Sequence, residues 1–220
     1  MSLVFPAPAP VTLPVAGGGS FPVHRVYCVG RNYAEHAQEM GFSGREPPFF
    51  FMKPADALVP VAAGETGTIA YPSLTANLHH EVELVVALGP GGRIFGHAVG
   101  LDMTRRDLQG EMKKQGRPWE IGKAFEQSAP IGPIVPLAAG GALDAGAITL
   151  DVNGQRRQSG DLKELIWNVA ETLEKLAEAW TLQPGDLVFT GTPAGVGAVV
   201  RGDLMEARIA GLPDLRVRVA

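Results

Sequence analysis

The chain lacks the features that mark secreted, disulfide-linked and membrane proteins. It carries a single cysteine in 220 residues, which excludes an internal disulfide, and we interpret Cys28 as a small core residue. No apolar run approaches the roughly 18 residues that a membrane-spanning helix needs. Residues 1–22 also lack the basic and apolar regions of a signal peptide. We therefore expect a cytoplasmic protein that binds no membrane.

Strong charge of either sign is also missing. The net charge is −4, and no basic run is interleaved with aromatic residues, so the usual source of nucleic-acid affinity is absent. The hydrophobic content of 45% is that of an ordinary globular protein, and the length suits one domain. We expect an N-terminal arm over residues 1–22, which are rich in proline and glycine, and one folded domain over residues 23–220.

Short apolar runs separated by glycine and proline predict a β-rich α+β domain. We expect strands over residues 26–29, 48–52, 81–88, 98–103, 148–152, 187–190 and 215–219. Apolar residues at helical spacing predict a long helix over residues 161–180, which a capping box of Asp161 and Glu164 would start. A short helix is expected over residues 34–40. The Asn153-Gly154 pair predicts a tight hairpin turn.

Two glutamates interrupt the apolar run that follows Leu78. Strand side chains alternate between faces, so Glu81 and Glu83 share one face with His79, while the apolar residues share the other. Two ionised carboxylates in a partly dry setting cost on the order of several kcal/mol each unless cations or donors compensate. From this run alone, a divalent-cation site and a solvated strand entrance are equally supported.

Asp102 supplies a third acid on a second predicted strand, where Leu101 and Met103 face the other way. Three carboxylates without a cysteine pair favour Mg²⁺ or Mn²⁺ over Zn²⁺, because these ions prefer oxygen ligands and keep positions for water and substrate. Adjacent strand residues point to opposite faces, so His79 and His80 cannot both join the cluster. Either histidine could be a ligand, but we favour structural roles or contacts to the ligands for both.

His36 and Glu39 are three residues apart in the predicted short helix, so their side chains lie on one face and can hydrogen-bond. A carboxylate that holds one imidazole nitrogen leaves the other free to take a proton from water. An exposed surface pair is the commoner reason for this spacing. The preceding Gly30-Arg31-Asn32-Tyr33 loop favours a catalytic base with its orienting acid.

Several polar residues suit the binding of an anion. Lys123 lies among small and apolar residues, so it either extends to water or reaches an anionic site, and we favour the site. Lys53 follows three phenylalanines, and is either a strand-end surface lysine or a charge for a substrate carboxylate. The strand of Asp102 is followed by several polar residues, and some of their charges are expected to form solvated pairs. Gln109 is the strongest candidate for a polar contact in this group, which consists of Arg105, Arg106, Asp107, Gln109 and Glu111. The glycine-rich residues 189–197 lack the lysine of a P-loop, and suit an anion site or a structural turn.

From about Val26 to the C-terminus, the chain resembles the fumarylacetoacetate hydrolase family in several blocks that follow one another in order. Residues 46–54 are most similar to the fumarylpyruvate hydrolases of gentisate breakdown, within the acylpyruvate hydrolase branch. The resemblance departs at Arg93-Ile94, where the family pattern places a helical segment and this chain has a very short link. The matching blocks are Gly30-Arg31-Asn32-Tyr33, His79-His80-Glu81-Val82-Glu83-Leu84, Leu101-Asp102-Met103-Thr104, Gly122-Lys123-Ala124-Phe125 and Thr190-Gly191-Thr192-Pro193-Ala194-Gly195-Val196-Gly197.

The resemblance implies a mixed β-roll fold, a homodimer, and a Mg²⁺ or Mn²⁺ ion held by Glu81, Glu83 and Asp102. It also implies that His36 and Glu39 activate water on a lid that orders over the substrate. The remaining site residues that it implies are Lys123 and Gln109 at the reacting oxygens, and Arg31, Tyr33, Lys53 and Thr192 on the substrate side.

The expected activity is metal-dependent hydrolysis of a C–C bond in an acylpyruvate, a small anionic diketo acid. Fumarylpyruvate would give fumarate and pyruvate. One alternative is decarboxylation of oxaloacetate or tautomerisation of a 2-oxo acid at the same site, because these reactions also pass through an enolate but need no attack by water. A second alternative is a non-catalytic, metal-stabilised binding module, which the presence of His36, Glu39 and Lys123 disfavours.

Overall fold

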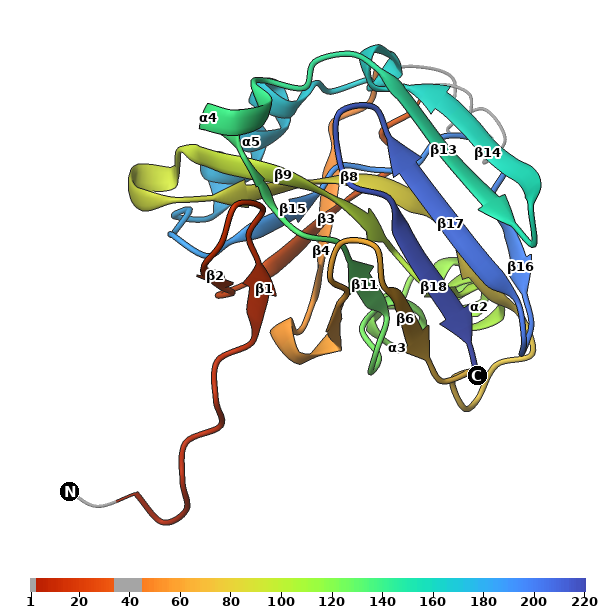
Figure 1. The fold of residues 1–220 in the computed structure, drawn as a ribbon. Helices are drawn as coiled ribbons and strands as arrows, with labels where there is room; N and C mark the ends of the chain where they lie inside the picture. The colour runs from red at the N-terminus through yellow and green to blue at the C-terminus, as the bar shows by residue number, and fades with distance from the viewer. Residues whose placement is uncertain (1–2, 34–44) are drawn as a thin grey trace.

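The apolar runs of the sequence form the largest sheet of the computed structural model, which describes residues 3–33 and 45–220 (Figure 1). This sheet has eight strands, in the order β4-β3-β15-β8-β9-β11-β5, with β12 also paired to β9. Two neighbouring pairs, β3 with β15 and β5 with β11, are parallel, so the sheet is mixed. Its strands are β3 (Val26–Gly30), β4 (Phe49–Lys53), β5 (Leu58–Pro60), β8 (Val82–Leu88), β9 (Ile94–Leu101), β11 (Ala129–Ile131), β12 (Val135–Pro136) and β15 (Leu187–Phe189).

A second sheet of five strands, in the order β14-β13-β17-β18-β6, packs against the first (Figure 1). Strands β13 and β14 form the hairpin that Asn153-Gly154 predicts, and these two residues have φ angles of 51° and 76°, which a tight primed turn requires. The strands are β6 (Thr66–Ile69), β13 (Ala147–Val152), β14 (Gln155–Asp161), β17 (Leu204–Ile209) and β18 (Leu215–Val219).

Smaller elements complete the described part of the chain. Three short strands pair in the order β10-β7-β16, and β1 pairs with β2. No helix among the described residues has the length and apolarity needed to cross a bilayer. The remaining elements are β1 (Thr12–Pro14), β2 (Ser20–Pro22), β7 (Leu78–His80), β10 (Thr104–Arg105), β16 (Gly197–Val199), α2 (Arg106–Gln115), α3 (Glu120–Lys123), α4 (Leu137–Gly140), α5 (Val169–Ala179) and the 3₁₀ turns η1 (Ala55–Ala57), η2 (Pro90–Gly92) and η3 (Leu162–Glu164).

The large sheet is buried on both faces. One face packs against the five-stranded sheet and α5 through residues such as Leu84 and Val86 of β8. The opposite face, which carries Val85 and Ala87, is covered in part by the β1–β2 hairpin through Leu13 and Phe21. Residues 12–22 of the expected N-terminal arm therefore include a hairpin that belongs to the core.

Each predicted strand overlaps an observed one, but the predicted helix over residues 161–180 was wrong in its first part. Asp161 and Glu164 do form a capping box, yet it starts only the 3₁₀ turn η3. Helix α5 begins after Asn168, which forms a second capping box with Glu171. Apolar spacing alone does not separate a 3₁₀ turn followed by a bend from a continuous helix. The predicted helix over residues 34–40 lies outside the described residues.

The short link between the two acidic strands closes a hairpin. Strand β8 runs antiparallel to β9, and the link between them forms η2. The backbone N–H of Gly89 donates to the carbonyl of Arg93 at 2.8 Å, which draws the strand ends together. The two strands therefore pair directly, without an intervening helix.

Candidate metal centre and active site

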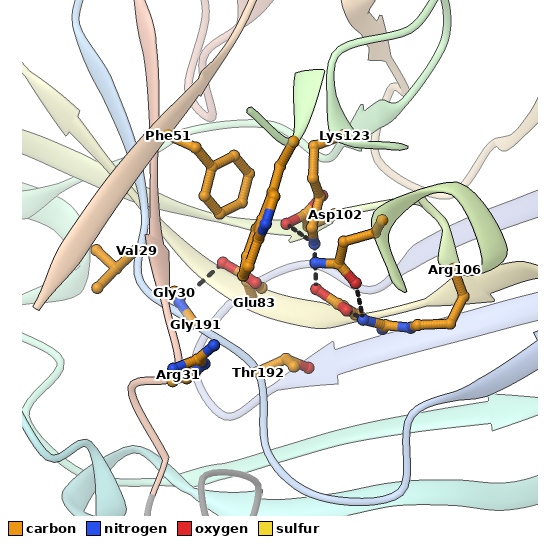
Figure 2. Close-up of a pocket in the computed structure, with 13 residues that line it drawn as sticks. Val29, Gly30, Arg31, Phe51, Glu83, Asp102, Arg106, Lys123, Gly191 and Thr192 are labelled. Carbon is orange, nitrogen blue, oxygen red and sulfur yellow. Dashed lines mark hydrogen bonds and ion pairs between the residues drawn. The ribbon is translucent and has the colours of Figure 1, made fainter. Parts of the chain in front are cut away.

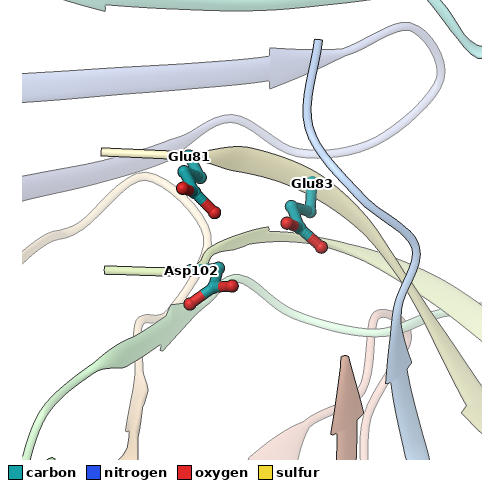
Figure 3. Close-up of side chains that lie close together, drawn as sticks. All are labelled: Glu81, Glu83 and Asp102. Carbon is teal, nitrogen blue, oxygen red and sulfur yellow. The ribbon is translucent and has the colours of Figure 1, made fainter. Parts of the chain in front are cut away.

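Backbone pairing between β8 and β9 places the three acids on one face (Figure 3). Val82 pairs with Leu101, and just beyond this pair the N–H of Asp102 donates to the carbonyl of Glu81 at 2.9 Å. Glu81 directly precedes β8 and Glu83 is two residues further on, so the alternation of extended backbone returns its side chain to the same face. Both faces of β8 are otherwise apolar, so the polar surface is confined to this end of the strand.

The three carboxylates are withdrawn from solvent. Glu81 is 4% exposed, Glu83 2% and Asp102 1%, and one oxygen from each lies within 4.8 Å of the others. Residues that ionise and crowd together in a dry site repel one another and lose hydration. The solvated strand entrance that the sequence left open is therefore excluded for these residues.

Three cations compensate this charge, and Figure 2 shows Lys123 and Arg106 among them. Lys123 Nζ donates to Glu81 Oε2 at 2.7 Å and to Asp102 Oδ2 at 2.6 Å. Burial disfavours the charged ammonium, but the two carboxylates outweigh this and raise the pKa of Lys123. Lys53 Nζ lies 2.9 Å from Asp102 Oδ1, and the Arg106 guanidinium pairs with the other oxygen of Glu81. The three positive charges of Lys53, Lys123 and Arg106 therefore equal in number the three carboxylates of the cluster.

Glu83 differs from its two neighbours because no lysine or arginine among the described residues forms an ion pair with it. It accepts a hydrogen bond of 2.8 Å from the backbone N–H of Gly191. Burial, followed by repulsion from Asp102 and Glu81, raises the pKa of Glu83 well above its ordinary value. Gly191 has a φ of 102°, and a Cβ there would meet the Cβ of Asn32 at 2.8 Å, so both its conformation and its close packing require glycine.

The donor set fits a hard divalent cation. All candidate ligand atoms are carboxylate oxygens, which Mg²⁺ and Mn²⁺ prefer. Two oxygens bound to one such ion by bonds of about 2.1 Å lie at most about 4.2 Å apart. The three carboxylate oxygens lie within 4.8 Å of one another, so the side chains need to move together only slightly to bind one ion. An ion held by these three acids would replace part of the charge compensation that Lys123 gives Glu81 and Asp102.

The structure brings most of the predicted site residues to one cavity. Arg31, Gln109, Lys123 and Thr192 line it together with the three acids. Two predicted substrate residues lie elsewhere: Lys53 is buried against Asp102 and is not part of this lining, and Tyr33 is buried, with a hydroxyl that has no hydrogen-bond partner among the described residues. The predicted His36 and Glu39 pair lies outside the described residues.

Sequence reasoning missed two features of the site. Arg106, which was not among the predicted site residues, begins α2 beside Glu81 and donates to Gln109 Oε1 at 2.5 Å. Phe51 and Trp119 form an aromatic side to the cavity, and this side continues into a wider cavity of about 410 Å³ that Arg31 and Phe49 also line. The apolar run before Lys53 was the available signal for the aromatic wall.

The two histidines hold structural positions on opposite faces, as their adjacency predicts. His79 Nε2 lies 2.9 Å from Asn77 Oδ1, and its Nδ1 accepts from Arg106 Nε at 3.3 Å. Burial and the Arg106 charge lower the pKa of His79 to about 4. His80 Nδ1 lies 2.9 Å from Gln158 Oε1, inside the molecule.

Replacing Lys123 tests whether this lysine and a cation compensate the same acids. In Lys123→Met, the protein should lose stability in EDTA, because leaving buried carboxylates without their partner costs about 3–5 kcal/mol. Mg²⁺ or Mn²⁺ should then raise the melting temperature more than in the unsubstituted protein, since the ion no longer displaces the ammonium. Thermal unfolding with EDTA and with each ion measures both effects.

The matched control is Lys175→Met, which removes an exposed helix-surface partner of Glu178 and should change neither value by much. Equal metal-induced shifts in Lys123→Met and in the unsubstituted protein would contradict the shared compensation.

The whole chain is similar in sequence and in structure to proteins of one known family. The family model for the fumarylacetoacetate (FAA) hydrolase C-terminal domain matches residues 25–220. A fumarylpyruvate hydrolase from Ralstonia sp. is 46% identical over 79% of this chain and 93% of its own length, and an oxaloacetate tautomerase from Escherichia coli (strain K12) is 41% identical over 83% and 87%. The crystal structure of fumarylpyruvate hydrolase from Pseudomonas aeruginosa in complex with Mn²⁺ and pyruvate has a TM-score of 0.98 and 57% identity, and it covers 100% of this chain and 99% of its own. The chain belongs to the fumarylacetoacetate hydrolase family.

Proposed function

We propose that the protein is a divalent-metal-dependent hydrolase that cleaves fumarylpyruvate into fumarate and pyruvate. The observation that carries the proposal is the buried cluster of Glu81, Glu83 and Asp102 on the wall of a cavity. The chain that holds this cluster matches, from end to end, a fumarylpyruvate hydrolase crystallised with Mn²⁺ and pyruvate. The reaction class is hydrolysis of a C–C bond in an acylpyruvate.

Glu81, Glu83 and Asp102 are the proposed ligands of Mg²⁺ or Mn²⁺. When bound, the ion supplies Lewis-acid polarisation of the 2-oxo acid group. Lys53 lies behind Asp102, away from the cavity lining, so its proposed role is to hold this ligand and offset its charge rather than to contact the substrate.

The cavity also offers positive charge for an anionic substrate. Lys123 is the proposed donor to the oxygen on which charge develops, because its ammonium lies at the cavity wall and stays charged. Gln109 and Thr192 line the same wall and are proposed substrate contacts. Arg31 lies over the rings of Phe49 and Trp119, at 5.2 and 6.0 Å from their centroids, and is proposed to bind the carboxylate at the far end of the acyl group.

His36 and Glu39 are the proposed water-activating pair. His36, held by Glu39, takes a proton from water while the water oxygen bonds to the acyl carbonyl carbon. The bond from that carbon to the pyruvate methylene breaks, and its electron pair passes to the pyruvate half as an enolate. The proton held by His36 then returns to the methylene carbon, which leaves fumarate and pyruvate, and Lys123 stabilises the enolate oxygen meanwhile.

An oxaloacetate tautomerase activity is the second candidate function. The similarity to the tautomerase from Escherichia coli supports it. Tautomerisation also passes through an enolate, but it moves a proton between carbon and oxygen and breaks no C–C bond. The products formed from oxaloacetate and from fumarylpyruvate therefore separate the two functions.

We also propose that the chain forms a homodimer. Residues 3–11 extend away from the rest of the molecule as an arm (Figure 1). Leu3, Val4 and Phe5 on this arm are 73%, 98% and 73% exposed, and a run of large apolar side chains on a free arm gains stability when a second copy covers it.

If the arm forms part of a homodimer interface, changing its apolar residues should weaken the association of the two copies. Light scattering should give twice the chain mass for the unsubstituted protein. Replacing Leu3, Val4 and Phe5 by serine should shift the dimer towards monomer at low concentration, because apolar contact area is lost. A monomeric unsubstituted protein would contradict the proposed dimer. A variant that dimerises as strongly as the unsubstituted protein would show that the arm is not part of the dimer interface.

If the protein is this hydrolase, adding it to fumarylpyruvate with Mg²⁺ or Mn²⁺ should remove the ultraviolet absorbance of the diketone. In EDTA the absorbance should stay unchanged. His36→Ala should lower kcat by about 10²–10⁴-fold, the usual contribution of a general base, while metal binding measured by calorimetry stays unchanged. The matched control, His24→Ala, changes a half-exposed histidine that pairs with Asp186 away from the cavity.

Three results would contradict parts of this proposal. Turnover that persists in EDTA would contradict the metal requirement. Full activity of His36→Ala would remove the proposed base. Rapid oxaloacetate tautomerisation with fumarylpyruvate left intact would establish the second candidate in place of the hydrolase.

A further inference from the structure

Gln158 is an unusual residue for its strand. It lies on β14, at the edge of the five-stranded sheet, where the other residues are exposed or half-buried. Gln158 alone in this strand is fully buried, at 0% exposure. A buried amide is costly unless all its hydrogen bonds are made, so its partners indicate what it does.

The partners fix the orientation of the Gln158 amide. Its Oε1 accepts from the backbone N–H of Val82 at 3.1 Å, and its Nε2 donates to the carbonyl of Pro193 at 2.9 Å. A backbone N–H can only donate and a carbonyl can only accept, so oxygen and nitrogen cannot be exchanged. His80 Nδ1, 2.9 Å from Oε1, must then donate as well. The remaining bond runs from Nε2 to Thr192 Oγ1 at 2.7 Å.

This arrangement decides how Thr192 can act. Its hydroxyl oxygen accepts the hydrogen bond from Gln158, so the hydroxyl proton must be directed at another acceptor. Thr192 lines the cavity beside Arg31 and the acids (Figure 2). The amide thus turns Thr192 into a hydrogen-bond donor at the cavity wall.

Strand β14 also fixes the loop that carries Thr192. A Cβ on Gly195 would lie 2.1 Å from the carbonyl oxygen of Arg157, and a Cβ on Gly160 would lie 2.8 Å from Pro193 Cβ. The loop and the strand therefore pack closely at two loop positions just after Thr192, Pro193 and Gly195. Gln158 lies between these two contacts, and it also bonds to Val82, next to the proposed ligand Glu81.

We propose that Gln158 is a positioning residue that holds the Thr192 hydroxyl as a donor to the carboxylate of the bound 2-oxo acid. The 2-oxo acid is the ligand class of the proposed function, on which this inference rests. Gln158 does not line the cavity, so it acts on the ligand only through Thr192. Its effect is to set the direction of one proton and to keep the loop at a fixed distance from the metal ligands.

Gln158→Glu reverses the hydrogen bond with little change of shape. A carboxylate has no N–H, so it accepts from the Thr192 hydroxyl and turns that proton away from the cavity. The Kd of pyruvate for the Mn²⁺-loaded protein, measured by calorimetry, should rise about tenfold, the value of one hydrogen bond to a charged group. The KM of fumarylpyruvate should rise by a similar factor while kcat changes much less, since the lost contact is present throughout the reaction.

Two controls separate this effect from charge and from folding. Gln155→Glu adds the same charge on the same strand at an exposed position and should leave the Kd unchanged. In a Thr192→Val background, where no hydroxyl remains, Gln158→Glu should add no more than about a twofold change. If Gln158→Glu does not fold, the neutral Gln158→Met supports the inference by the same Thr192-dependent rise in Kd.

Each outcome decides the inference. A Thr192-dependent rise in the pyruvate Kd supports it. A Gln158→Glu protein with a lower melting temperature and an unchanged Kd would overturn it in favour of a purely structural role, and so would an equal rise in the Thr192→Val background. An unsubstituted protein that binds pyruvate but leaves fumarylpyruvate intact would contradict the proposed function alone, since the calorimetric comparison does not depend on hydrolysis.

Discussion

Three carboxylates within 4.8 Å of one another, at the end of one face of a buried sheet, are the constraint on which the rest of the site depends. Each loses hydration and repels the others, so the fold must bring cations or a metal to them. Lys53, Lys123 and Arg106 meet this need from β4, α3 and α2, three elements that are separate in the chain. The arrangement of those elements around β8 and β9 therefore follows from electrostatic compensation as well as from apolar packing.

Much of the fold could be predicted because strand patterning is local. The runs around Val26, Glu81 and Leu215 alternate or stay apolar over the length of a strand, and each forms one. Strand β14 was indicated only by the Asn153-Gly154 turn before it, because its own residues carry no apolar alternation that would give its length. The helix expected from residue 161 fails for a related reason: its first apolar residues pack as a 3₁₀ turn, which shares short-range spacing with an α-helix.

The acidic cluster could be predicted because Glu81 and Glu83 lie two residues apart at the start of one predicted strand and Asp102 lies at the end of a second one. Lys123 was expected either to extend to water or to reach an anionic site, and it lies at the cavity wall in contact with Glu81 and Asp102. Arg106 and Gln158 were missed because their partners, Glu81 and Thr192, are distant in sequence and only the tertiary fold joins them. Lys53 shows the same limit: its local run suggested a charge facing the substrate, whereas packing of β4 turns it towards Asp102.

The central claim is that Glu81, Glu83 and Asp102 bind one divalent cation in place of part of the charge that Lys123 now supplies. A crystal structure of the protein with Mn²⁺ and pyruvate, using the anomalous signal of manganese, tests it most directly. The account predicts one manganese peak at about 2.1–2.2 Å from an oxygen of each acid, with the Lys123 ammonium moved from at least one of its two carboxylates towards the pyruvate. A manganese ion bound elsewhere, or held by fewer than three of these acids while Lys123 keeps both ion pairs, would contradict it.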